Sequence, residues 1–165
     1  MYINYREIYP DYRFKHNKRF FLPIFNLYLC PQYEQHDTMK KIQLTDTHKE
    51  KLFQIPLFRN LPLNIKEALL EKLDFVVYIA NKKEIVVTQG TPCNKLYVLL
   101  EGKLRTDIID GLGNEVMIEY IIAPRTFATP HLFNPNNTLP ATFTALEDSV
   151  ILMATKDSTF KVISQ

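Results

Sequence analysis

The feature that most constrains this chain is a series of short apolar segments after Leu73. Seven segments rich in Val, Ile, Tyr and Phe are separated by polar or glycine-containing turns. We expect strands at 75–80, 84–89, 96–100, 103–109, 115–122, 141–146 and 149–153. Strands this short and this evenly spaced predict antiparallel sheets in a sandwich or jelly-roll barrel, because a parallel sheet would need a crossover helix between its strands. Gly90 and Gly102 lie in two of the turns, where a positive φ is expected.

Helical signals flank the predicted strands. Thr47 and Glu50 have the spacing of a capping box and predict a helix that ends before Pro56. Asn64 repeats that signal ahead of a second helix at about 65–73, and Asp157 or Ser158 is expected to cap a last one. The chain therefore predicts a mainly β fold with flanking helices.

The composition changes near Met39. Ten of the 20 Tyr and Phe residues precede it, and they follow neither a helical nor a strand period. Residues 1–38 are therefore interpreted as an appendage, either disordered or produced by an early start codon. Residues 39–165 are interpreted as one domain that is cut off in its last helix.

Charge and cysteine content favour a cytoplasmic protein without nucleic-acid or membrane contacts of its own. The formal net charge is only +2, so no basic stripe for DNA or anionic lipid is expected. Cys30 and Cys93 lie too far apart in the sequence for a CxxC pair, and neither a zinc cage nor a disulfide scaffold is expected. The apolar run 20–30 is too short to span a bilayer.

Four spaced elements carry a resemblance to a known family. Over about residues 45–165, the sequence resembles the cyclic nucleotide-binding domain at the N-terminus of Crp/Fnr-family transcription regulators. The elements are LFRNLP (57–62), Gln89-Gly90, LYVLLEGKLR (96–105) and LF (132–133). The resemblance implies a β-roll, a double-stranded jelly-roll barrel, with a short helix in its ligand cassette at 129–133.

The cassette is degenerate. Members of the family that bind cyclic nucleotides begin it with Gly-Glu and end it with Arg-Ser/Thr-Ala, which bind the ribose and the cyclic phosphate. Here the corresponding residues are Ala128-Thr129 and Leu139-Pro140-Ala141, so the carboxylate, the guanidinium and one backbone N–H are missing. We therefore expect no response to cyclic AMP or cyclic GMP. The candidate pocket residues are Ala128, Thr129, His131, Leu132, Phe133, Leu139, Pro140 and Ala141, with Arg105 and Arg125 as substitute anion contacts.

Other chemistry has little support in the sequence. None of the four histidines lies on a predicted strand, so a cupin-like metal site is not expected, and no nucleophile motif indicates an enzyme. Cofactors are not expected, although His131 leaves haem binding as an alternative. Cys93 is interpreted as a loop residue, with an exposed redox thiol as the alternative.

The resemblance implies a regulatory sensor domain. Its effector is an unknown small molecule or none. Family regulators continue into a dimerising helix and a helix-turn-helix, so homodimerisation and DNA contact are expected only in a longer form with the C-terminal domain that this chain lacks. The alternatives are a stand-alone protein-interaction module and a sensor of another small molecule.

Overall fold

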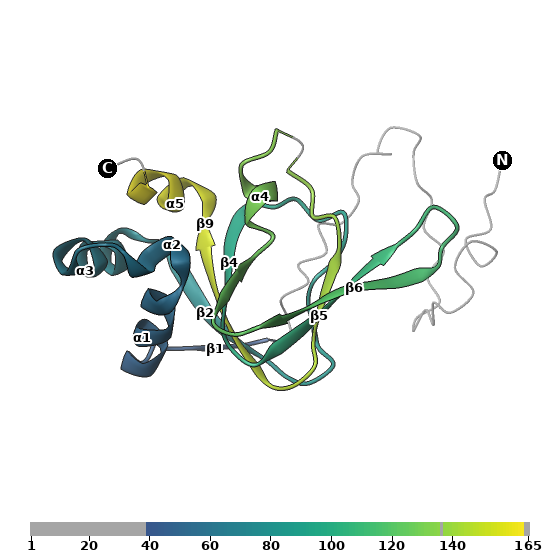
Figure 1. Cartoon of the computed structure of the whole chain (residues 1–165), viewed down its shortest axis with the longest axis horizontal. Coiled ribbons are helices and arrows are strands. Elements are labelled where there is room, and N and C mark those ends of the chain that lie inside the picture. Colours follow the sequence, from purple (N-terminus) through teal and green to yellow (C-terminus); the bar gives the residue numbers. More distant parts are fainter. Residues whose placement is uncertain (1–38, 136, 164–165) are drawn as a thin grey trace, which may run out of the picture. The chain divides into compact units, whose positions relative to one another are not determined.

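The computed structural model describes residues 39–135 and 137–163. The predicted appendage at 1–38 lies outside the described residues. The elements in chain order, drawn in Figure 1, are β1 (Lys40–Ile42), α1 (Asp46–Gln54), α2 (Pro56–Arg59), α3 (Leu63–Lys72), β2 (Phe75–Ala80), β3 (Ile85–Val87), β4 (Lys95–Glu101), β5 (Lys103–Ile109), β6 (Glu115–Ile122), β7 (Arg125–Phe127), α4 (Thr129–Leu132), β8 (Thr142–Ala145), β9 (Ser149–Thr155) and α5 (Lys156–Ile163).

The strands form two antiparallel sheets. The first has the order β1-β2-β9-β4-β7 and the second has the order β3-β8-β5-β6. The mainly β fold with flanking helices and β-roll topology is thus confirmed. In Figure 1 the helices α1, α2, α3 and α5 lie together on one side, and the β5–β6 hairpin extends away from them.

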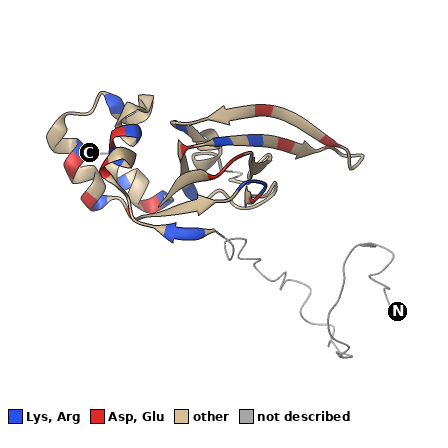
Figure 2. Cartoon of the chain, turned by 90° about the horizontal axis from the view of Figure 1, so that it is seen from below, with Lys and Arg blue, Asp and Glu red and all other residues tan. Residues whose placement is uncertain are grey.

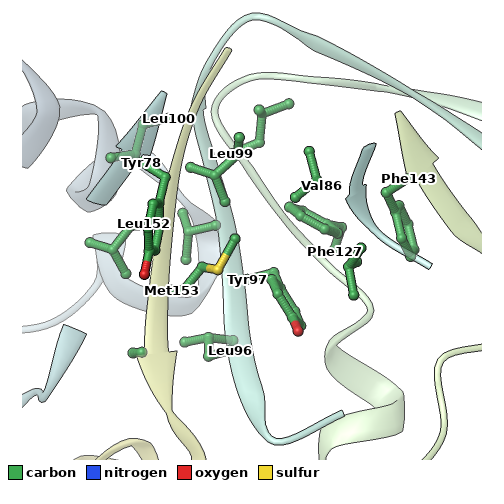
Figure 3. Close-up of a cluster of buried hydrophobic side chains, with 14 of the residues drawn as sticks. Tyr78, Val86, Leu96, Tyr97, Leu99, Leu100, Phe127, Phe143, Leu152 and Met153 are labelled. Carbon is green, nitrogen blue, oxygen red and sulfur yellow. The ribbon is translucent and has the colours of Figure 1, made fainter. Parts of the chain in front are cut away.

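Strands β4 and β9 lie at the centre of the core, and both are buried along almost their whole length. Residues Leu96 to Leu100 are at most 2% exposed. A strand with one solvated face would alternate apolar and polar residues, whereas the apolar run LYVLL indicates a strand covered on both faces. Figure 3 shows this cluster, in which Leu99, Tyr97 and Met153 lie together with residues of the facing sheet.

The turn between β4 and β5 requires glycine. Gly102 has φ +89°, and a Cβ at this position would lie 2.9 Å from the carbonyl oxygen of Asp148 and 2.9 Å from the Cα of Ser149. Gly90 also has a positive φ, +83°, but a Cβ there would have no atom within 4 Å. Both predicted turns are confirmed, and only at Gly102 does close packing add to the backbone requirement.

The helix starts differ from the predictions. The N-cap of α1 is Thr45 and not Thr47, because the Thr45 hydroxyl accepts a hydrogen bond from the His48 N–H and the His48 ring accepts one from the Thr45 N–H. Asn64 lies inside α3, whose N-cap Pro62 makes no side-chain hydrogen bond. At α5 the Thr155 hydroxyl accepts from the Ser158 N–H at 3.4 Å, in place of a cap by Asp157 or Ser158.

Charged residues of both signs are interspersed along the helices and strands, as Figure 2 shows. This distribution agrees with the small net charge of +2. In the described residues no helix is both long and apolar enough to cross a membrane.

Candidate functional site

A cavity of about 620 Å³ lies beside the predicted cassette. Its wall combines the junction of α1 and α2, the β5–β6 hairpin, the segment from β7 to α4, and the start of β8. This volume is in the range of about 300–1,000 Å³ that is usual for small-molecule pockets. The lining residues are Ile55, Pro56, Leu57, Thr106, Ile108, Ile118, Glu119, Ile121, Arg125, Thr126, Phe127, Ala128, Thr129, Pro130, His131, Pro140, Ala141 and Phe143.

The β5–β6 hairpin forms part of the cavity wall, and a β-bulge in β6 determines which of its side chains reach the cavity. Thr106 pairs with Glu119 and the next residue, Asp107, pairs with Met117, so Ile118 is an extra residue on β6. A bulge bends its strand and redirects side chains. Both Ile118 and Glu119 consequently line the cavity, although neighbouring residues on a regular strand would point to opposite faces.

Three aromatic rings join the two sheets, and two of them, Phe127 and Phe143, line the cavity. The ring of Phe127, on β7, stacks on Tyr97 of the same sheet with 5.3 Å between centroids. It also contacts Phe143, on β8 of the other sheet, with 4.9 Å between centroids. Figure 3 shows Tyr97, Phe127 and Phe143 in sequence across the core. Tyr97 is buried, and this burial raises the pKa of its phenol.

Helix α4 begins with a backbone feature that supports the alignment of the cassette. Ala128, the N-cap, has φ +55°, which is the left-handed region that glycine adopts most easily. In the family resemblance this position is the glycine of Gly-Glu. The short cassette helix is thus present, and alanine takes the conformation that the turn requires.

The structure brings only part of the predicted site to the cavity. Ala128, Thr129, His131, Pro140 and Ala141 line it. The remaining candidates lie elsewhere: Leu132 and Leu139 are buried in the core, and Phe133 is 46% exposed and makes a T-shaped contact with Phe160.

The two candidate anion contacts have different positions. Arg125 lines the cavity, where its guanidinium lies 3.5 Å from the Glu119 carboxylate. Arg105 is absent from the lining, and its guanidinium binds Asp107 at 2.7 Å and Glu115 at 3.1 Å. The hydrogen bond that Arg105 donates to the Asp107 carboxylate raises the pKa of the guanidinium. The structure therefore brings one of the two arginines to the cavity, and that one already has a counter-charge.

Two threonine hydroxyls in the cavity wall are unsatisfied. The Oγ1 atoms of Thr106 and Thr129 are buried, and neither has a hydrogen-bond partner among the described residues. A buried hydroxyl without a partner costs about 1–3 kcal/mol. No local sequence pattern marks Thr106, because a threonine on a strand is common and its neighbours in space come from β6 and β8.

Backbone donors for an anion are scarce at the cassette. Pro130 lies in the first turn of α4 and has no N–H, and Pro140 also has none. The Leu139 N–H already donates to the Thr91 carbonyl at 2.8 Å. Pro130 and Pro140 thus offer no backbone donor to a cyclic phosphate, and the Leu139 N–H is used within the fold.

No metal site is assembled within the described residues, where no group of three or more His, Cys, Asp and Glu side chains comes together. His131 is half-buried on α4. Cys93 is fully buried, and burial raises the pKa of its thiol. The exposed redox thiol considered for Cys93 is therefore wrong, because the side chain packs in the core next to the Ala128 carbonyl.

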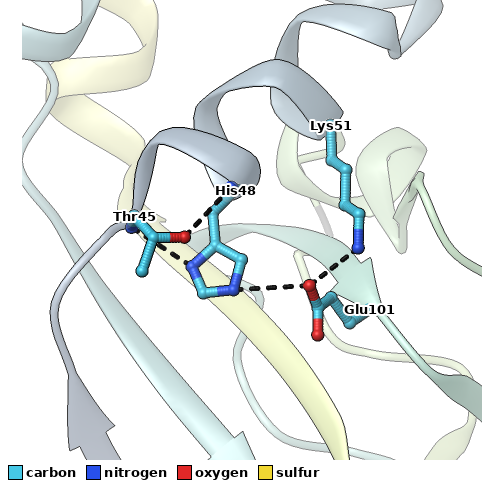
Figure 4. Close-up of polar contacts among 4 residues, drawn as sticks. All are labelled: Thr45, His48, Lys51 and Glu101. Carbon is cyan, nitrogen blue, oxygen red and sulfur yellow. Dashed lines mark hydrogen bonds and ion pairs between the residues drawn. The ribbon is translucent and has the colours of Figure 1, made fainter.

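A polar cluster missed by the sequence analysis anchors α1 to β4 (Figure 4). The Lys51 ammonium lies 2.7 Å from the Glu101 carboxylate, and the His48 Nε2 lies 3.5 Å from the same oxygen. Since the His48 Nδ1 accepts the Thr45 N–H, its Nε2 is the ring nitrogen placed toward Glu101. Lys51 lowers the pKa of Glu101. In the sequence, this cap is marked only by Thr45 with a histidine three residues later, His48, in the position that Glu or Gln usually has in a capping box.

Comparison with known proteins places this geometry in a family. The model of the cyclic nucleotide-binding domain matches residues 80–165, which include β3 and every later element. No curated protein sequence matches the chain. The sensor domain of the transcriptional regulator DNR from Pseudomonas aeruginosa is similar in structure, with a TM-score of 0.62 and 24% identity over 72% of this chain and 77% of that chain.

Two further structures have the same fold. A transcriptional regulator from Thermotoga maritima gives a TM-score of 0.54 and 28% identity over 59% of this chain and 74% of that chain. The regulatory domain of Toxoplasma gondii PKA, solved with cAMP, gives 0.61 and 16% identity over 70% of this chain and 43% of that chain. The family match spans more than half of the chain and includes the cassette helix and the cavity wall that follows it. The chain belongs to the cyclic nucleotide-binding domain family.

Proposed function

We propose that this domain is the regulatory sensor portion of a Crp/Fnr-type transcription regulator, and that it does not respond to cyclic AMP or cyclic GMP. The proposal places it in the cytoplasm, without catalytic activity, and assigns DNA contact to another domain. One observation supports it: a cavity lies beside the cassette, and Thr129 and Leu139 stand where a carboxylate and a guanidinium would hold a cyclic nucleotide.

The energetic argument concerns the phosphate and the ribose. Hydrogen bonds to charged groups contribute about 1.5–3 kcal/mol each, and a buried anion without a partner costs more. Thr129 and Leu139 replace the carboxylate and the guanidinium, so two such contacts are lost. This loss corresponds to roughly two orders of magnitude or more in affinity. Arg125 does not restore it, since its side chain is 55% exposed and a contact screened by water contributes less than a buried charge-assisted hydrogen bond.

Calorimetric titration with cyclic AMP and cyclic GMP tests the ligand part of the proposal. The Toxoplasma gondii PKA regulatory domain, solved with cAMP, is the positive control under identical conditions. We expect heat of binding for the control and none for this domain. Micromolar binding of either nucleotide would refute the proposal.

Sequencing of the gene through codon 165 and beyond tests the regulator part. The structures that support it are the regulator from Thermotoga maritima and the sensor domain of DNR. A helix-turn-helix in the same frame or a shifted frame would support a regulator. A stop codon with no such sequence behind it would contradict this part and favour the stand-alone interaction module.

A further inference from the structure

We propose that the cavity binds a neutral, mainly apolar small molecule that carries a hydroxyl or carbonyl oxygen. This inference rests on the proposed function, because it takes the cavity as the effector site. It specifies the chemical class of the effector, which the loss of the phosphate contacts leaves open.

The wall is mainly hydrocarbon. Ile108, Ile118 and Ile121 line it from the hairpin, while Phe127 and Phe143 form the aromatic end. Burial of apolar ligand surface against such a wall contributes about 25 cal/mol for each Å² removed from water. Most of the ligand surface is therefore expected to be hydrocarbon.

The charges of the wall argue for a neutral ligand. Apart from His131, the ionisable lining residues are one arginine and one glutamate, and these form an ion pair with each other. The two side chains are about half exposed, at 55% and 47%, so their charges offset each other and are screened by water. A charged ligand group would lose its hydration in the apolar cavity without an unpaired counter-charge in the wall to offset that loss.

The two buried hydroxyls specify the polar part of the ligand. Thr106 is only 4% exposed, and its Oγ1 has no partner among the described residues; the same holds for the Oγ1 of Thr129. A hydroxyl can both donate and accept a hydrogen bond, so one ligand oxygen can satisfy it. Rotation about χ1 exchanges the Thr hydroxyl with its methyl group, which lets the oxygen reach a ligand in the cavity.

Octan-1-ol, octanoate and octylammonium test this inference, since they share one hydrocarbon chain and differ in charge. Isothermal titration calorimetry of the whole chain with each probe should show binding of octan-1-ol, with both ions bound at least about tenfold more weakly because each ion loses hydration and meets no unpaired counter-charge. Equal or tighter binding of either ion would overturn the argument from charge. Failure of octan-1-ol to bind up to its solubility limit would overturn the inference.

A pair of threonine variants locates the site. Thr106→Val keeps the shape of the side chain and removes the hydroxyl, and should weaken octan-1-ol binding about threefold to tenfold, the worth of one neutral hydrogen bond. Thr144→Val is the matched control, because Thr144 lies on the neighbouring strand β8 and is not part of the cavity wall. Circular dichroism of both variants verifies that they fold. An equal effect in the two variants, or no effect in Thr106→Val, would contradict the assigned site.

The two proposals fail separately. Binding of cyclic AMP in the same calorimeter would refute the proposed function, whatever octan-1-ol does. Absence of binding by all probes and both nucleotides would refute the ligand class alone, and the regulatory role would still be judged from the gene sequence.

Discussion

The turn at Gly102 gives a quantitative prediction when Gly102→Ala is compared with Gly90→Ala. Both glycines have φ near +85°, at +89° and +83°, so alanine costs a similar backbone strain of about 1–2 kcal/mol at either position. Only at Gly102 does the new methyl group also meet backbone, at 2.9 Å from both the Asp148 oxygen and the Ser149 Cα, and it meets the Ser149 hydroxyl as well. Overpacking of this kind costs a further 1–3 kcal/mol or so.

We therefore expect Gly90→Ala to lower the free energy of unfolding by about 1–2 kcal/mol and Gly102→Ala to lower it by about 2–5 kcal/mol. Urea unfolding followed by circular dichroism measures both values, and the two slopes must agree for the comparison to hold. If Gly102→Ala precludes folding, Gly102→Ala combined with Ser149→Ala removes the hydroxyl contact and should recover part of the loss. Equal losses in the two single variants would refute the steric reasoning, because the backbone strain alone would then explain both.

Two further predictions concern helix α1. Thr45→Ala should lower the free energy of unfolding by about 0.5–2 kcal/mol because it removes the N-cap, whereas Thr47→Ala, at an exposed position inside the helix, should change it little. Urea unfolding of the two variants decides between the caps, and a larger loss for Thr47→Ala would contradict the assignment of Thr45. Glu101 has a lowered pKa because of Lys51, so its ionised form stabilises the fold above the ordinary value of 4.5, and this stabilisation disappears as the pH falls through the lower folded value. The difference in urea midpoint between the wild type and Glu101→Gln should therefore shrink as the pH falls below 4.5, and a difference that does not change with pH would contradict the contact.

Every strand except β1 and β7 was predicted near its place in the sequence. The bounds of β2, β5 and β6 agree with the predicted ones. Strands β1 and β7 were missed because each has three residues that include charged ones, whereas the equally short β3 is the apolar run IVV. The N-cap of α1 was misplaced because two pairs have the spacing of a capping box, Thr45 with His48 and Thr47 with Glu50. The second pair was chosen because glutamate is the usual partner in a capping box and histidine is not.

Only the part of the cavity wall that is built from consecutive residues of the cassette could be predicted from the sequence. Five of the cassette residues named from the sequence line the cavity, because the resemblance gave their positions along the chain. Leu132 and Leu139 were misplaced, since an apolar side chain next to a pocket satisfies the sequence pattern equally well when it faces the core. Thr106 and Ile118 reach the cavity through strand pairing and a bulge, and neither feature leaves a local signal.

The aromatic row Tyr97–Phe127–Phe143 has a consequence for the range of molecules that this cavity can accept. Its central ring contacts both sheets, so that end of the cavity cannot widen unless the sheets separate and the packing of the core is lost. Another part of the wall is Ile118 on β6, the outermost strand of its sheet, where a half-exposed side chain can change rotamer without disturbing a second layer. Differences in effector size among related proteins should accordingly arise from substitutions on this outermost strand, while the aromatic end sets a fixed depth.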